Sequence, residues 1–167
     1  MVEDPQKCLE LLSSHNIQYT LYEHPAMNGI DDAGRAPAMR GLILKNLVLT
    51  NKNRNFYLFS APLTSRVNLK LLSKELGEPR FSFADEADLQ ELQLRKGHVS
   101  PLSLVNDSGK RINFVRAAEL DNYELVNCHP LNNSFSIDIR LDDLDFMVQQ
   151  VFGHTLTKIR GCIVETN

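Results

Sequence analysis

The sequence predicts a single α+β domain, with one mixed, mostly antiparallel β-sheet and helices packed around it. Three observations support this fold class. Strand-like and helix-like segments alternate irregularly, without the strand–helix–strand repeat of a doubly wound parallel sheet. Turn residues join several strand-like segments directly. The 167 residues suit one domain, and no repeat, low-complexity tract or linker divides them, so we take 1–167 as one domain.

The N-terminal half is expected to begin with a helix and continue with strands. Asp4 is a typical N-cap and Pro5 suits the first helical position, where its missing N–H costs nothing. Residues 26–37 form a predicted loop with a short helix from Asp31 onward. The other predicted elements are strands at 17–22, 42–50 and 55–61, the last two as antiparallel neighbours, and a helix at 68–76 that ends at Gly77.

The C-terminal half is expected to contain two helices and four strands. The link at 106–109 (Asn-Asp-Ser-Gly) is a strong hairpin signal between two of these strands. The predicted helices are 85–94 and 141–152, the second ended by Gly153, and the predicted strands are 99–105, 111–116, 123–128 and 135–140.

Composition limits the class of protein. Lys and Arg total 18 against 21 Asp and Glu, which gives a net charge of −3 and a pI near 5.9. Because proteins that bind long nucleic acids are usually basic, any RNA contact should be confined to a small patch, and we expect no DNA binding. The chain lacks a run of 18 apolar residues and a signal-peptide pattern, so we expect no membrane partner and a cytoplasmic location.

Cysteine and histidine spacing argues against a metal site or a disulfide framework. Cys8, Cys128 and Cys162 form no CxxC pair, which favours reduced thiols. The five histidines show no metal-ligand spacing, so we predict neither a metal nor another cofactor.

Lys45 is the first candidate functional residue. It lies within the apolar segment 42–50, where a lysine is rarely buried without a partner. One interpretation places it at a sheet edge, with its ammonium group extended to water. The other places it at the floor of a cleft, where it would bind an anion such as a phosphate.

Two further segments could carry chemistry. Gly97 can adopt unusual backbone angles that let a ligand approach the main chain, and Pro101 removes a hydrogen-bond donor, although the same residues could simply form a turn into a strand. His129, held extended by Pro130, could be a general base, a hydrogen-bond donor or a structural residue. A Cys–His nucleophile is disfavoured, because the adjacent Cys128 would point to the opposite face of a strand.

Taken together and in order, these segments resemble the YbaK/ProX family, which comprises the editing insertion of bacterial prolyl-tRNA synthetases and its free-standing relatives. The resemblance extends from about Leu9 to His154. The runs KNLVL and HPLNNSFSIDIRLDDLDF are closer to the ProX branch, which edits alanyl-tRNA(Pro), than to the YbaK branch, which edits cysteinyl-tRNA(Pro). The matching motifs are Lys45-Asn46-Leu47, Gly97-x-x-Ser100-Pro101, Asn106-Asp107, His129-Pro130-Leu131-x-Asn133 and Gly153-His154.

The resemblance implies a trans-editing hydrolase for mischarged tRNA(Pro), most of all Ala-tRNA(Pro). Lys45 corresponds to the family lysine that contacts the phosphate and ribose of the terminal adenosine, with Asn46 as a polar neighbour. The loop from Gly97 through Ser100 to Pro101 orients the attacking water and the scissile carbonyl, and His129 positions the aminoacyl group. The family lacks a protein nucleophile, and a tRNA ribose hydroxyl assists hydrolysis.

The chain also departs from the family pattern. The stretch from Met27 to Met39 differs, and we expect these two methionines to wall the amino-acid pocket. Arg116 and Ala117 replace a more apolar run, which suggests an edge strand, and the tail 155–167 has no assigned counterpart. The implied partner is the acceptor end of tRNA(Pro), with prolyl-tRNA synthetase as a second candidate. The alternatives are a Cys-tRNA(Pro) deacylase and a non-catalytic tRNA- or synthetase-binding module with the same fold.

Overall fold

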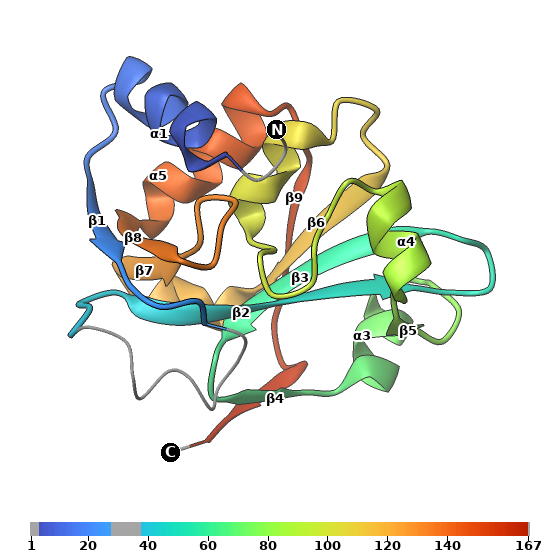
Figure 1. The fold of residues 1–167 in the computed structure, drawn as a ribbon. Coiled ribbons are helices and arrows are strands. Elements are labelled where there is room, and N and C mark those ends of the chain that lie inside the picture. Colours follow the sequence, from blue (N-terminus) through green and yellow to red (C-terminus); the bar gives the residue numbers. More distant parts are fainter. Residues whose placement is uncertain (1–3, 28–37, 167) are drawn as a thin grey trace.

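The computed structural model describes residues 4–27 and 38–166, in which helices pack around a strongly twisted sheet (Figure 1). The short helix predicted from Asp31 lies outside these ranges. Helix α1 (Pro5–Ser14) begins as predicted, because the side chain of Asp4 accepts a 3.0 Å hydrogen bond from the backbone N–H of Gln6. It ends before Asn16, whose φ of 58° is left-handed.

The main sheet has eight strands. Seven form a continuous path in the order β1-β8-β7-β2-β3-β6-β9, and β5 pairs with β2 beside this path. These strands are β1 (Tyr19–Glu23), β2 (Leu42–Thr50), β3 (Phe56–Pro62), β5 (Ser82–Phe83), β6 (Ile112–Ala117), β7 (Leu125–Cys128), β8 (Phe135–Arg140) and β9 (Leu156–Ile159).

The pairing pattern confirms a mixed, mostly antiparallel α+β domain. Strands β1 and β8, β7 and β8, β2 and β3, and β2 and β5 pair antiparallel. The pairs β2–β7, β3–β6 and β6–β9 are parallel. A separate antiparallel pair joins β4 (Ser65–Val67) to β10 (Ile163–Glu165), so the unassigned C-terminal tail contributes a strand to each sheet.

Side-chain caps fix the remaining helices. Asn68 caps α3 (Leu69–Glu75), and Asp85 forms a capping box at α4 (Glu86–Glu91), which is shorter than the predicted 85–94. Helix α5 (Leu141–Phe146) continues into a π-helical turn, η3 (Met147–Val151), and Gly153 follows with φ of 74°. No helix within 4–27 and 38–166 is long and apolar enough to cross a membrane.

The strand predicted at 99–105 is wrong. Residues Pro101–Asn106 form a 3₁₀ helix, η1, because Ser100 caps it and Pro101 suits its first position. The link at 106–109 therefore joins a helix to β6 and is not a hairpin. Asp107 anchors it: its buried carboxylate accepts hydrogen bonds from the N–H groups of Arg111 and Ile112 and lies 2.9 Å from Nε2 of His154.

The edge position inferred for Arg116 is also wrong. Strand β6 lies between β3 and β9, and the side chain of Arg116 is only 2% exposed. Its guanidinium group forms ion pairs with Asp121 at 2.6 Å and Asp145 at 2.9 Å. These carboxylates explain why an arginine is tolerated in a central strand.

Candidate functional site

Strand β2 has an open stretch along one side. Strand β3 pairs with β2 from Leu44 to Leu49. On the opposite side, β7 pairs only with Leu42 and Ile43, and β5 pairs only with Leu49 and Thr50. Residues 44–48 therefore have no strand partner on that side within the described chain.

The backbone of this stretch faces outward at alternate residues. The N–H of Leu63 donates to the carbonyl of Ile43 at 2.9 Å, so residue 43 is hydrogen-bonded toward β3. In an antiparallel pair the direction alternates, which turns the N–H and C=O groups of Leu44 and Asn46 to the open side. The carbonyl of Val48 also faces that side, where it accepts from the N–H of Ala84 at 2.9 Å.

A cavity of about 1120 Å³ opens at this stretch. Its wall is formed by β2 itself, by the segment from β5 to the turn after α4, and by single side chains from other loops. The residues that line it are Met27, Ile43 to Val48, Leu63, Phe83 to Glu86, Leu89, Gln90, Leu94 to Gly97, Val99 and His129.

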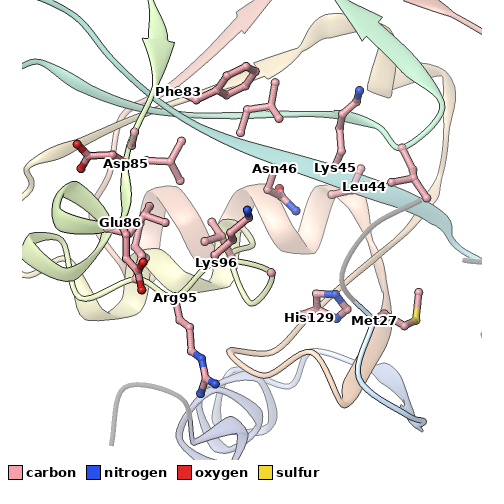
Figure 2. A pocket seen from close by; sticks show the side chains of 18 of the residues that line it. Met27, Leu44, Lys45, Asn46, Phe83, Asp85, Glu86, Arg95, Lys96 and His129 are labelled. Atoms are coloured by element: carbon pink, nitrogen blue, oxygen red, sulfur yellow. The ribbon is translucent and has the colours of Figure 1, made fainter. Parts of the chain in front are cut away.

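The cavity has two sides with different chemistry (Figure 2). Successive residues of a strand point to opposite faces, so Lys45 and Asn46 diverge. Lys45 extends on the same side as Phe83, whereas the side chains of Asn46, Lys96 and His129 lie on the other side of β2.

Lys45 is half-buried in the cavity wall. Burial lowers the pKa of its ammonium group. No carboxylate of the described chain pairs with it, so the charge is available to a ligand. Lys45 therefore combines the two interpretations, the sheet edge and the cleft. It lies at a local edge of the sheet, and this edge forms part of the wall of a cavity.

His129 presents one ring nitrogen to the cavity. Its Nδ1 lies 2.8 Å from the carbonyl oxygen of Phe135, so Nδ1 carries the proton in the neutral ring and Nε2 is an acceptor. Burial lowers the pKa of His129, and nearby His24 and His98 lower it further against the opposing effect of the Phe135 carbonyl. The ring is therefore neutral at pH 7.

A second histidine supports this arrangement from behind. Nε2 of His24 lies 2.8 Å from Oγ of Ser136, and that oxygen lies 3.4 Å from Nδ1 of His129. Nδ1 of His24 lies 2.8 Å from the carbonyl of Pro25 and is its donor, so Ser136 donates to His24. These contacts favour the tautomer with the proton on Nδ1 in both His24 and His129.

Asn46 presents its amide group to the same side of the cavity as His129. Oδ1 of Asn46 accepts a 2.6 Å hydrogen bond from the hydroxyl of Ser60, which is 1% exposed on β3. Because the oxygen is occupied in this way, the Nδ2 donors are directed to the cavity.

Gly97 lies in the cavity wall with φ of 83°, a conformation that favours glycine, so the predicted unusual backbone angle is confirmed. Its neighbour Lys96 reaches toward Asn46, and Arg95 extends from the same turn (Figure 2). Sequence analysis missed both cations, although their position directly before Gly97 was a usable signal.

Ser100 and Pro101 lie behind the wall and do not line the cavity. Ser100 is fully buried, and its hydroxyl donates to the carbonyl of His129 at 2.6 Å. The hydroxyl also accepts from the N–H of Leu102 at 3.1 Å. Ser100 thus joins the start of η1 to the strand end that carries His129, and acts on the site through that backbone.

The two methionines occupy different places. Met27 is buried in the cavity wall, and two hydrogen bonds hold its backbone to Asn133, one from the N–H of Met27 and one to its carbonyl. Met39 lies outside the wall, where its sulfur accepts from Nδ2 of Asn127 at 3.2 Å.

The thiols are poor candidates for a nucleophile. All three cysteines are buried and free. Burial raises the pKa of Cys8 to about 12 and raises that of Cys128 still further. Within the described residues no group of three His, Cys, Asp or Glu side chains could hold a metal ion.

Comparisons with known proteins identify the family of this chain. The model of the aminoacyl-tRNA editing domain family matches residues 24–146. The prolyl-tRNA editing protein ProX of Acetoanaerobium sticklandii is 33% identical over 147 residues, covering 86% of this chain and 90% of that protein. The prolyl-tRNA synthetase associated domain-containing protein 1 of Danio rerio is 32% identical over 139 residues, covering 81% and 76%.

Solved structures show the same fold. A hypothetical protein superposes with a TM-score of 0.69 at 15% identity, over 93% of this chain and 98% of that one. A scaffold used for computational epitope grafting gives 0.68 at 15% identity, over 94% and 96%. Because the family model matches residues 24–146 and the ProX relative is 33% identical over most of both chains, the chain belongs to the YbaK/ProX family of aminoacyl-tRNA editing domains.

Proposed function

We propose that this protein is a trans-editing hydrolase that deacylates mischarged tRNA(Pro), with Ala-tRNA(Pro) as its main substrate. One observation carries the proposal: the cavity at the open edge of β2 combines a neutral His129, the amide of Asn46 and the Gly97 turn with the cation of Lys45, which pairs with no carboxylate of the described residues. The relative named as a prolyl-tRNA editing protein supports the choice of tRNA.

The reaction is the hydrolysis of the ester between the amino acid and the terminal ribose. Nε2 of His129 accepts a hydrogen bond from a water molecule and orients it toward the ester carbonyl. The amide of Asn46 and the open N–H groups of β2 are donors for the oxygen that becomes negative as the carbon turns tetrahedral. The water oxygen bonds to the carbonyl carbon, and the bond from that carbon to the ribose oxygen then breaks. The leaving ribose oxygen takes the proton that the attacking water gives up, and the neighbouring ribose hydroxyl relays it.

Lys45 anchors the nucleic acid. Its ammonium group lies on the opposite side of β2 from His129, so the ester and the phosphate are held at two sides of one strand. An ammonium group is a compact point charge suited to a phosphate oxygen. Holding both ends reduces the motions available to the ester and brings it close to the water.

The small size of alanine explains why an editing site separate from the synthetase pocket is needed. A synthetase pocket built for proline discriminates against a smaller side chain by only about 1–3 kcal/mol per methylene. An editing cavity with apolar walls reverses the selection, because it admits alanine and excludes proline. Met27, Leu44 and Val99 contribute such walls here.

Deacylation assays with Ala-, Cys-, Ser- and Pro-charged tRNA(Pro) test the proposal. We expect Ala-tRNA(Pro) to be cleaved fastest and Pro-tRNA(Pro) to persist, with EDTA leaving the rate unchanged. Faster cleavage of Cys-tRNA(Pro) would assign the YbaK-type substrate. Binding of all four without turnover would show a non-catalytic binding module.

A further inference from the structure

Phe83 is an exposed aromatic residue at the rim of the cavity. Its side chain is 62% exposed, and it lines the cavity together with Lys45. Within the described chain its ring has no aromatic or cation partner. Phe81, two residues earlier, is 4% exposed and packs edge-on against Tyr57, with ring centroids 5.1 Å apart. The core therefore uses the first phenylalanine and leaves the second open.

The register of the sheet puts Phe83 and Lys45 on one face. Phe83 lies opposite Leu49 in the β2–β5 pair. Every second residue of a strand points to the same face, so Leu49, Leu47 and Lys45 share the face of Phe83. Figure 2 shows Phe83 and Lys45 on that side. Four residues of extended strand separate the level of Phe83 from Lys45, which is about 14 Å.

The backbone around Phe83 is held rigidly. The N–H of Ala84 donates to the carbonyl of Val48 at 2.9 Å, and Asp85 begins α4 with a reciprocal capping box. The platform is therefore preorganised, and a phenyl ring loses little rotamer freedom when a ligand covers it.

We infer that Phe83 is a stacking platform for a nucleobase of the unpaired 3′ end of the tRNA. This rests on the proposed function, which brings single-stranded RNA to the cavity. An aromatic face together with a cation farther along the same surface is the combination that binds single-stranded nucleic acids, since every base has a π-face and every nucleotide a phosphate. Lys45 is that cation.

The charged residues at the rim of the cavity determine the path of the bound RNA. Asp85 and Glu86 also line the cavity, and they repel a phosphate. Asp85 is committed to the cap of α4, where its carboxylate accepts from the N–H of Asp88 at 2.8 Å. The phosphates therefore follow the Lys45 side of β2, while the base covers Phe83.

Binding of an uncharged RNA tests this inference. The probe is a tRNA(Pro) acceptor-stem hairpin labelled at its 5′ end, made with the full CCA end and with one, two or three of these nucleotides removed. We expect Phe83→Ala to weaken binding of the full hairpin roughly 5- to 100-fold. Phe83→Tyr should bind normally, and the effect of Phe83→Ala should vanish once the stacked nucleotide is removed.

A matched control separates stacking from a general loss of apolar surface. Phe146 is 42% exposed, and its edge contact with the ring of His15 lies outside the cavity. Phe146→Ala should leave binding unchanged. Phe83→Ala should also keep the slope of log affinity against log salt, because stacking neutralises no phosphate, whereas Lys45→Ala should reduce that slope.

The outcomes are distinguishable from those of the activity assay. Equal binding by Phe83→Ala and the unmodified protein would overturn the platform, even if deacylation were intact. An equal loss for every hairpin, including the one without CCA, would also overturn it and would indicate contact with the stem. CCA-dependent binding through Phe83 without any deacylation would support the platform and refute the proposed enzyme.

Discussion

The carbonyl oxygen of Phe135 lies 2.8 Å from Nδ1 of His129 and selects the ring nitrogen that faces the cavity. The contact is possible because the chain reverses after Pro130: Leu131 has φ of 73°, a left-handed conformation that is costly for leucine. Leu131 is 3% exposed, so packing offsets this strain. The loop thus fixes an acceptor, Nε2, at the site.

Deacylation should depend on the neutral form of His129. Because burial and two neighbouring histidines lower its pKa, we expect the rate to stay constant above pH 7 and to fall only at a pH below the ordinary histidine range. Rates corrected for spontaneous ester hydrolysis would show this profile. His129→Gln should lower the rate and remove the acid limb, and a rate that rises on acidification would contradict a neutral acceptor.

The lowered pKa of His129 should also make the folded protein less stable at acid pH. A histidine whose pKa is lower in the folded state binds more protons when the chain is unfolded. Acid pH therefore stabilises the unfolded state relative to the folded one. This contribution to the free energy of unfolding is complete above the ordinary histidine pKa and disappears as pH falls through the lowered one. Urea unfolding at several pH values would measure it, and His129→Gln should flatten that part of the dependence.

Lys45→Ala should abolish deacylation and preserve the fold. The substitution removes a half-buried charge that has no partner in the described chain, so folding loses little. Loss of the phosphate anchor misplaces the ester, and we expect kcat/KM to fall by at least roughly 100-fold. Thermal melts and single-turnover assays would test both parts. Lys52→Ala, an exposed lysine in the turn after β2, is the matched control, and full activity of Lys45→Ala would refute the anchor.

Cys128→Ser should remain active. Cys128 is 4% exposed, and burial keeps its thiol protonated, so it cannot act as a nucleophile. The new hydroxyl in this buried site should lower the free energy of unfolding by about 1–3 kcal/mol. Rates per folded molecule would separate stability from catalysis, with Cys128→Ala as the comparison. Inactivity of both folded variants would reinstate the thiol.

Local sequence patterns predicted much of this fold. The Asp4 and Asp85 caps, the long apolar run of β2 and the Gly97 turn were recognisable because short-range chemistry determines them. The segment 99–105 was mistaken for a strand because its apolar run is compatible with either structure. Ser100 decided the outcome, since its hydroxyl caps η1 and also donates to the carbonyl of His129, 29 residues later in the chain.

Long-range pairing was beyond the reach of these patterns. Arg116 resembled an edge residue, and its burial is possible because Asp121 and Asp145, the latter from α5, both pair with its guanidinium group. The open stretch of β2 also depends on long-range pairing, because β5 and β7 each pair with only two residues of that strand. Local sequence patterns therefore could not predict it. The lysine and the histidine of the site were predicted, but their separation to two sides of β2 was not.

The buried ion pair of Arg116 gives a stability prediction. Asp145→Ala leaves the guanidinium group with Asp121, which is 42% exposed and a weaker partner. We expect the free energy of unfolding to fall by about 3 kcal/mol, because removing one member of a buried pair leaves an uncompensated charge. Asp142→Ala, at an exposed position of the same helix, should have little effect. Equal urea midpoints for the two variants would contradict this account.

Selectivity should depend on the volume of the cavity next to Met27. The side chain is buried in the wall, and Asn133 fixes its backbone, so the wall cannot retreat easily from a larger aminoacyl group. Overpacking of such a site costs about 1–3 kcal/mol, or roughly 5- to 150-fold in rate. Met27→Ala should therefore raise cleavage of Pro-tRNA(Pro) relative to Ala-tRNA(Pro) by a factor in this range.

Met39 provides the comparison, because its sulfur contacts Asn127 outside the wall. Met39→Ala should leave the ratio of the two rates unchanged, and Met27→Leu, which nearly conserves volume, should change it little. Thermal melts would verify that each variant is folded, since truncating a buried methionine costs about 2–5 kcal/mol. If the folded Met27→Ala variant still spared Pro-tRNA(Pro) as completely as the unmodified protein, volume at this position could not be the basis of selection. Proline would then have to be excluded by the chemistry of its secondary amine, which the same assay would reveal with a charged tRNA that carries a primary amine of equal bulk.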